Sequence, residues 1–202
     1  MIWENPIAPT QPCWSTILLM TDLLRRLNIH RLKAPTLGQG VYLAGTAVVV
    51  GDVTLGDCSS VWYHAVLRGD INRIVVGHHT NIQDNAVIHL DEDVPCMVGN
   101  YVTIGHSAIV HACTVADEVL IGMGSTILDG AHVGSQSIVG ANSLVPRGMQ
   151  VPPKSLVHGS PARVIRTLTE DECRELRQLA EKYVINATFC LEHGVGGDPV
   201  TR

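Results

Sequence analysis

A six-residue repeat is the feature of this sequence that most constrains its fold. From Leu37 onward an aliphatic residue returns every six positions, and the step fails at only three points. An amphipathic helix has an apolar period of about 3.6 residues, so the repeat excludes a long helix over this region. The repeating aliphatic residues are Leu37, Leu43, Val49, Leu55, Val61, Leu67, Val76, Ile82, Ile88, Val98, Ile104, Val110, Val115, Ile121, Ile127, Val133, Val139 and Val145.

Each six-residue unit suits a short strand followed by a turn. Stacked units bury a continuous inner column of aliphatic side chains, while each strand pairs with the coils above and below it. Three units make one coil of about 18 residues. Glycines would serve the corners, where a positive φ or a close backbone approach is needed: Gly45, Gly51, Gly56, Gly77, Gly99, Gly105, Gly122, Gly134 and Gly140. The sequence therefore predicts an all-β solenoid, a parallel β-helix of hexapeptide repeats.

The repeat occupies only the middle of the chain. Residues 1–33 break the pattern and form an N-terminal extension, in which we expect a short helix from Thr21 to Leu32. The β-helix domain is expected over residues 34–166 and a C-terminal helix over residues 167–192. We predict that residues 193–202 are a disordered tail.

The C-terminal helix has both a start signal and an apolar face. Thr169 and Glu172 have capping-box spacing, and Leu168 and Cys173 can form a hydrophobic staple. The residues predicted to face the solenoid or a neighbouring subunit are Leu176, Leu179, Ala180, Tyr183, Val184, Ala187 and Leu191.

Charge and cysteine usage exclude several classes of partner and location. The net charge is -5 and no basic run occurs, so we expect no nucleic acid and no membrane as a partner. No apolar stretch approaches the roughly 20 residues needed to span a bilayer. The six cysteines form no CxxC pair, so we expect reduced, mostly buried thiols and a cytoplasmic protein.

The repeat brings particular histidines together. Ile88 and Val110 are 22 residues apart with a four-residue insertion, so they occupy equivalent places on successive coils, and His89 stacks directly below His111. Strands about 4.8 Å apart allow two imidazoles to share one metal ion. His106 lies in the preceding unit and should face another side, so a third ligand would come from a neighbouring subunit. A cyclic trimer creates three equivalent sites of this kind.

The residues around these histidines resemble the gamma-class carbonic anhydrases. The matching motifs are Arg68-Gly69-Asp70, Asn81-Ile82-Gln83-Asp84-Asn85, His89, and Gly105-His106-Ser107 through His111. The resemblance covers roughly residues 34–192 and implies a left-handed β-helix. It also implies a homotrimer with metal sites at subunit interfaces, in which His89 and His111 come from one subunit and His106 from the next.

The resemblance further implies an activity, the zinc-dependent, reversible hydration of carbon dioxide to bicarbonate. Zn²⁺ is the implied cofactor, although Fe²⁺ or Co²⁺ suits three imidazoles as well. Gln83 would bond the water on the metal, and Arg68, Asp70 and Asp84 would form an interface network near it. Arg68 and Asp70 fit a purely structural ion pair equally well.

Two further residues are carried over from the family. Tyr183 resembles a tyrosine that many relatives place near the site. Ile71 stands where the founding enzymes carry a proton-shuttle glutamate, and the acidic stretch after His89 is short. Glu92 is the best substitute shuttle in this stretch.

Three function classes therefore stay open: a zinc hydratase, a metal-binding relative, and an acyltransferase. The relative would have little hydratase activity and would act as a scaffold or an acyl-thioester hydrolase, and Ile71 with the short acidic loop favours it. An acyltransferase would use a histidine base and a coenzyme A groove, and the three-histidine set argues against it.

Overall fold

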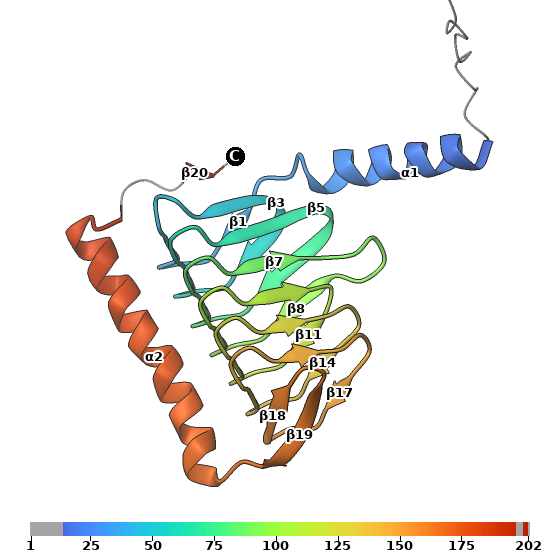
Figure 1. Ribbon diagram of the computed structural model, residues 1–202. Coiled ribbons are helices and arrows are strands. Elements are labelled where there is room, and N and C mark those ends of the chain that lie inside the picture. The colour runs from blue at the N-terminus through green and yellow to red at the C-terminus, as the bar shows by residue number, and fades with distance from the viewer. Residues whose placement is uncertain (1–13, 197–199, 202) are drawn as a thin grey trace, which may run out of the picture.

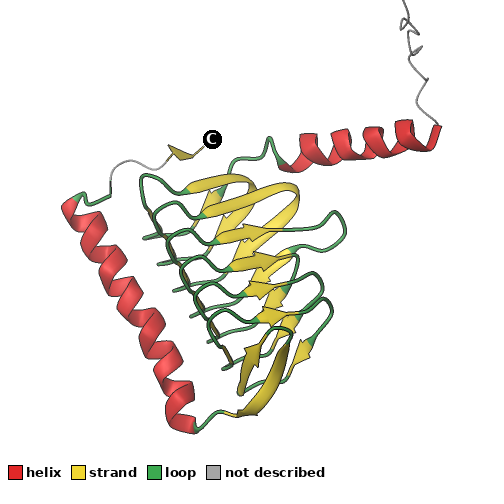
Figure 2. Cartoon of the chain, in the orientation of Figure 1, coloured by secondary structure: helices red, strands yellow, loops and turns green. Residues whose placement is uncertain are grey.

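The protein is a left-handed parallel β-helix with one helix at each end of the chain (Figures 1 and 2). The computed structural model describes residues 14–196 and 200–201. The fold class predicted from the repeat is confirmed. Helix α1 (Trp14–His30) projects from the N-terminal end of the solenoid, and α2 (Glu170–His193) runs along one side of it.

Two sheets wrap the solenoid. One contains, in spatial order, β16 (Leu144–Val145), β13 (Thr126–Ile127), β10 (Ile109–His111), β7 (Val87–His89), β5 (Val66–Val76), β8 (Cys96–Val98), β11 (Thr114–Val115), β14 (His132–Val133) and β17 (Gln150–Val151), with β1 (Thr36–Leu37), β3 (Val48–Leu55) and β20 (Val200–Thr201) joined at β3. The other contains β19 (Ala162–Thr167), β18 (Ser155–Gly159), β15 (Ile138–Val139), β12 (Leu120–Ile121), β9 (Thr103–Ile104), β6 (Asn81–Ile82), β4 (Ser60–Val61) and β2 (Tyr42–Leu43). The antiparallel pair β18 and β19 closes the far end.

The long strand β5 divides the first sheet into two faces. Its first half pairs with β7, where Leu67 lies opposite Ile88, and its second half pairs with β8, where Val75 lies opposite Met97. The second sheet is the third face of the coil. Side chains at equal positions of successive coils therefore form vertical columns.

The inner column is the core predicted from the repeat. Every repeating aliphatic residue is buried except Leu37, which lies on the terminal strand β1 and is 42% exposed. The column continues beyond the predicted series through Val151 and Val157, which are also buried. Burial of aliphatic side chains contributes about 25 cal/mol per Å², so this column is the main source of stability.

The corner glycines serve close backbone approach rather than positive φ. Among the predicted corner glycines that the structure tests, only Gly51 has a positive φ. A Cβ atom on Gly122 would lie 2.5 Å from the Ala141 nitrogen, and one on Gly105 would lie 2.7 Å from the Ile121 oxygen. Non-glycine residues such as Asn85, with φ 60°, take most of the left-handed turn positions. Stacked coils thus leave no room for a side chain at these glycines.

Helix α2 packs along the second sheet. Its N-terminus has the predicted capping box between Thr169 and Glu172, which satisfies two backbone N–H groups that would otherwise lack partners. Leu168, Cys173 and Leu176 form one cluster with strand residues of this sheet. The predicted apolar face is wrong at Leu191, which is 48% exposed, because the helix turns Cys190 inward instead.

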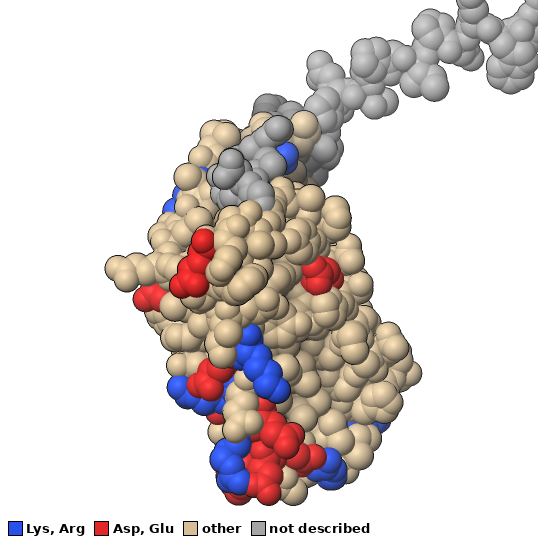
Figure 3. All heavy atoms as spheres, turned by 90° about the vertical axis from the view of Figure 1, so that its left-hand side faces the viewer, with Lys and Arg blue, Asp and Glu red and all other residues tan. Residues whose placement is uncertain are grey.

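Charged side chains gather at one end of the face that carries α2 (Figure 3). They surround the start of the helix, where Lys154 pairs with Glu170 and Arg166 pairs with Glu172. Carboxylates in the first turn interact favourably with the helix dipole. The rest of this face is mainly uncharged.

The terminal segments differ in detail from the sequence expectations. The N-terminal helix was expected over Thr21–Leu32, but α1 begins at Trp14 and ends at His30. In the predicted disordered tail 193–202, His193 ends α2, Gly194 caps it, and Val200–Thr201 pairs with β3. Residues 197–199 and 202, and the first 13 residues, lie outside the described part of the chain.

The described cysteines are free thiols, as predicted. Cys96, Cys113, Cys173 and Cys190 are buried, while Cys58 is partly exposed. Cys13 lies outside the described residues.

Truncation of an inner-column residue tests the source of stability. We expect Ile121→Ala to lower the free energy of unfolding by about 2–5 kcal/mol, because it leaves a cavity in a column that cannot collapse. Urea denaturation followed by circular dichroism measures the change. The matched control is Ile165→Ala, since Ile165 is 57% exposed. A loss for Ile121→Ala no larger than for the control would contradict the assignment of the core.

Candidate metal centre

Two histidines face each other on adjacent coils. His89 ends β7 and His111 ends β10, and the two residues are direct partners in the parallel register. Nδ1 of His89 lies 3.2 Å from Nε2 of His111, and the ring centroids are 5.2 Å apart. The stacking predicted from the 22-residue spacing is therefore confirmed.

The buried carboxylate of Asp70, which pairs with the exposed Arg68, fixes the ring of His89. Asp70 Oδ1 lies 3.1 Å from Nε2 of His89, and the other oxygen of Asp70 accepts a hydrogen bond from Arg68. Burial raises the pKa of Asp70, but the hydrogen bonds from Arg68 and His89 outweigh it and hold this pKa below its usual value. Burial lowers the pKa of His89, which favours the neutral imidazole that a metal ion requires.

His111 has a matching carboxylate that the sequence interpretation missed. Asp129 Oδ1 lies 2.5 Å from Nδ1 of His111, and Asp129 Oδ2 lies 3.4 Å from Arg147. The hydrogen bond with His111 holds the pKa of Asp129 below its usual value. A signal was present in the sequence, because 129 − 111 and 147 − 129 both equal 18, the length of one coil.

His106 lies apart from this pair, at the corner that follows β9 in the second sheet. Its Nδ1 is 2.8 Å from Asp84 Oδ2, while Asp84 Oδ1 accepts the backbone N–H of Tyr63 at 3.1 Å. Gln83 is buried, and its Oε1 accepts the backbone N–H of His106 at 3.2 Å. Gln83, Asp84 and His106 thus form one group, although they belong to two separate motifs of the sequence.

The predicted site residues accordingly fall into two groups within one chain. Arg68, Asp70, His89 and His111 lie on one face, and Gln83, Asp84 and His106 lie on another. Among the residues that the structure describes, no three histidine, cysteine or carboxylate side chains gather closely enough to hold a metal ion. Within one chain, the predicted metal ligands therefore lie in two separate groups.

Tyr183 is placed beside the second group by α2. It packs edge-on against Trp62, with ring centroids 5.6 Å apart. Burial raises its pKa, and the nearby Asp84 carboxylate raises it further. Tyr183 is therefore a neutral phenol at neutral pH.

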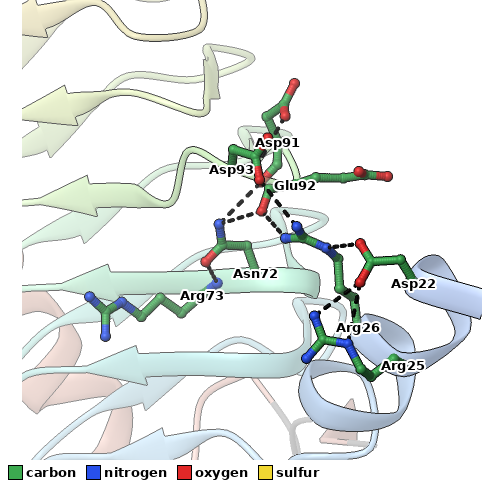
Figure 4. Close-up of polar contacts among 8 residues, drawn as sticks. All are labelled: Asp22, Arg25, Arg26, Asn72, Arg73, Asp91, Glu92 and Asp93. Carbon is green, nitrogen blue, oxygen red and sulfur yellow. Dashed lines mark hydrogen bonds and ion pairs between the residues drawn. The ribbon is translucent and has the colours of Figure 1, made fainter. Parts of the chain in front are cut away.

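The loop that carries Glu92 is fixed by α1 (Figure 4). Arg26 donates to the backbone oxygen of Glu92 and to Asp93. Asn72 donates to the backbone oxygens of Asp91 and Glu92 at 3.3 and 3.0 Å. These contacts hold the backbone of the loop that follows His89.

A partly apolar groove lies beside His106. It has a volume of about 370 Å³, and its lining includes His106, Leu120, Met123, Ile138 and Leu179. The groove runs between the second sheet and α2, and His106 lines it at one corner of the coil.

The coil architecture and its six-residue repeat define a hexapeptide-repeat protein. A Bacillus cereus protein described as a putative acetyltransferase superposes with a TM-score of 0.78 at 36% identity, covering 80% of this chain and 94% of that one. No family model matches the sequence. In the described part of the chain, no helix is long and apolar enough to cross a membrane.

Curated relatives narrow this class. A probable carbonic anhydrase of Methanocaldococcus jannaschii is 49% identical over 148 residues, which cover 73% of this chain and 93% of the relative. The mitochondrial gamma carbonic anhydrase 2 of Arabidopsis thaliana is 42% identical over 158 residues, covering 75% of this chain and only 57% of that relative's length. The chain belongs to the gamma-carbonic-anhydrase-like family of hexapeptide-repeat proteins.

Replacement of Asp70 tests the electrostatics of its contacts with Arg68 and His89. The pKa of Asp70 is lower in the folded chain than its unfolded value of about 3.9, so its stabilising contribution is present above that pH and is lost on further acidification. We expect Asp70→Asn to lower the free energy of unfolding of EDTA-treated protein by about 1–3 kcal/mol at pH 7. The deficit should shrink below pH 4.

Urea denaturation at several pH values measures this deficit. Asp93→Asn is the control, because the side chain of Asp93 is 83% exposed and its ion pair should contribute less than about 1 kcal/mol. A deficit for Asp70→Asn that is independent of pH would contradict the assigned charge state.

Proposed function

We propose that the protein is a metal-dependent carbonic anhydrase of the gamma class, which catalyses the reversible hydration of carbon dioxide to bicarbonate. The observation that carries the proposal is the pair of ring nitrogens of His89 and His111, which face each other 3.2 Å apart. Membership of the family supports the reaction class. We further propose a homotrimer with Zn²⁺ as the metal and the cytoplasm as its location.

The geometry of the histidine pair suits a metal ion. Zinc binds histidine nitrogens at about 2.0–2.1 Å in a tetrahedral arrangement, in which two ligand atoms are about 3.4 Å apart. The nitrogens of His89 and His111 are separated by 3.2 Å. Each ring also keeps its second nitrogen on a carboxylate, the arrangement that orients metal-ligating histidines.

His106 of a neighbouring subunit would complete the site. Its Nδ1 is engaged by Asp84, which leaves Nε2 free for a metal, and it lies away from the His89–His111 pair of its own chain. A cyclic trimer joins the two half-sites at each of three interfaces. Three protein ligands leave one coordination position for water, which is typical of catalytic sites.

The residues around the metal would divide the chemistry. A bound zinc ion lowers the pKa of water to about 7, a value known from carbonic anhydrase itself. Gln83, held by the backbone of His106, would hydrogen-bond the attacking oxygen. Asp70 and Asp84 would hold ligand rings, Arg68 would hold Asp70, and the phenol of Tyr183 would lie near the substrate. Glu92 would carry the released proton to solvent.

A second candidate function is acyl-thioester hydrolysis at the same metal. The groove of about 370 Å³ beside His106 favours it, because its apolar lining suits an acyl chain better than carbon dioxide. Ile71 is partly buried against the core and offers no proton shuttle at its position. Metal binding alone does not separate the two functions, so both activities need to be measured.

Subunit mixing tests the shared metal site. We expect His106→Ala and His111→Ala to abolish stoichiometric metal binding when each variant is alone, because each lacks one ligand at all three interfaces. Unfolding and refolding the two variants together should restore one intact interface in every mixed trimer, about a quarter of the wild-type metal for random assembly.

Metal analysis of the purified trimers measures this recovery. The control is a mixture of His106→Ala with itself, in which every interface stays incomplete. Retention of full metal by His106→Ala, or no recovery in mixed trimers, would refute the intersubunit site.

Stopped-flow measurement of carbon dioxide hydration tests the reaction. Metal-replete, reduced wild type should be active, and Gln83→Ala should lower kcat by about 10–100-fold, as loss of an outer partner does in metal sites. Gln150→Ala is the matched control, because Gln150 is exposed on β17. A metal-replete protein with no hydratase activity would refute the hydratase proposal and leave acyl-thioester hydrolysis as the candidate function.

A further inference from the structure

A column of polar side chains runs down one face of the solenoid through five neighbouring strands. The strand order is β16, β13, β10, β7 and β5. Following or within these strands come Arg147, Asp129, His111, His89 and the pair Arg68 and Asp70. Each histidine of the facing pair is thus backed by an aspartate, and each aspartate is paired with an arginine.

The upper half of this column, Arg68 and Asp70 with His89, belongs to the family motif. In the lower half, Asp129 and Arg147 beside His111 do not. Arg68 and Asp70 were expected near the metal. Asp129 and Arg147 were not, although Asp129 contacts His111 at 2.5 Å, closer than the 3.1 Å between Asp70 and His89. The lower half therefore has the contacts to orient its histidine as the upper half does.

The two carboxylates determine which ring nitrogens can face each other. An ionised carboxylate only accepts hydrogen bonds, so the nitrogen beside it must carry a proton. Asp129 therefore places the proton of His111 on Nδ1, and Asp70 places that of His89 on Nε2. The remaining nitrogens then direct two lone pairs at the same point, where a metal ion or a proton would remove their repulsion.

We propose that Asp129 is a positioning residue for the metal centre, which fixes the ring of His111 so that Nε2 presents its lone pair beside Nδ1 of His89. The inference rests on the proposed metal site. Without Asp129, the His111 ring would be free to rotate and to exchange the proton between its two nitrogens. Arg147 assists from a greater distance, since it lies 3.4 Å from Asp129 with 73% of its side chain exposed.

Metal affinity is the first test. Competition with a chromophoric chelator, with Zn²⁺ and Co²⁺ as probes on the full-length protein, should show about 10–100-fold weaker binding for Asp129→Ala. Asp129→Asn keeps an acceptor in place and should recover part of this loss. Arg147→Ala should weaken binding less than either variant. Asp117→Ala is the control, because the carboxylate of Asp117 accepts hydrogen bonds from Asn100 at another corner.

The protonation pattern of the His111 ring is the second test, and it needs no metal. In ¹⁵N-histidine spectra of metal-free wild type near pH 8, His111 should show its proton on Nδ1. The signal is assigned by its loss in His111→Ala. Asp129→Ala should move His111 toward a mixture of the two tautomers, a change that altered stability of the fold would not produce.

The two measurements separate the possible failures. If the wild type binds no metal, the proposed metal function fails, while the tautomer of His111 still decides the role of Asp129. If Asp129→Ala binds metal as tightly as wild type, or if His111 keeps the same tautomer in this variant, the positioning role is overturned.

Discussion

The in-register pairing of parallel coils is the interaction on which the rest of the structure depends. Leu67, Ile88, Val110, Ile127 and Val145 are successive partners along one face, and each buries its side chain in the same inner column. Because the column is continuous, a residue beside it has a fixed height and a fixed direction. The outward-facing residues next to these five aliphatic residues are therefore stacked in the same order, and His89 and His111 are one such stacked pair.

The same regularity explains why the proposed centre needs more than one subunit. A column brings together residues from successive coils but from only one face, so one chain supplies two stacked imidazoles and their carboxylates. His106 lies around the corner, tied to Asp84 and Gln83. An interface between chains can join residues of two faces that a straight solenoid keeps apart, so the proposed function and the proposed assembly depend on each other.

Sequence spacing predicted the fold and the pairing of His89 with His111, because both follow from the period of the repeat. It did not predict the contact of Asp129, since the interpretation followed the family motif rather than the next coil. It predicted that the corner glycines allow either a positive φ or a close backbone approach, and only the structure shows that close approach is the reason at Gly105 and Gly122. The anchoring of the Glu92 loop by Arg26 was likewise invisible, since these residues are 66 positions apart.

The tight stacking at the glycine corners also governs how such a chain can change in length. A single residue added inside a coil would turn the following side chains out of the core and misalign every column below it. Extra residues are tolerated where the chain already leaves the coil, as it does between Ile88 and Val98 directly after His89. Changes of length or charge in that loop would therefore leave the imidazoles beside it in place, although they would alter the contacts that Arg26 and Asn72 make with it.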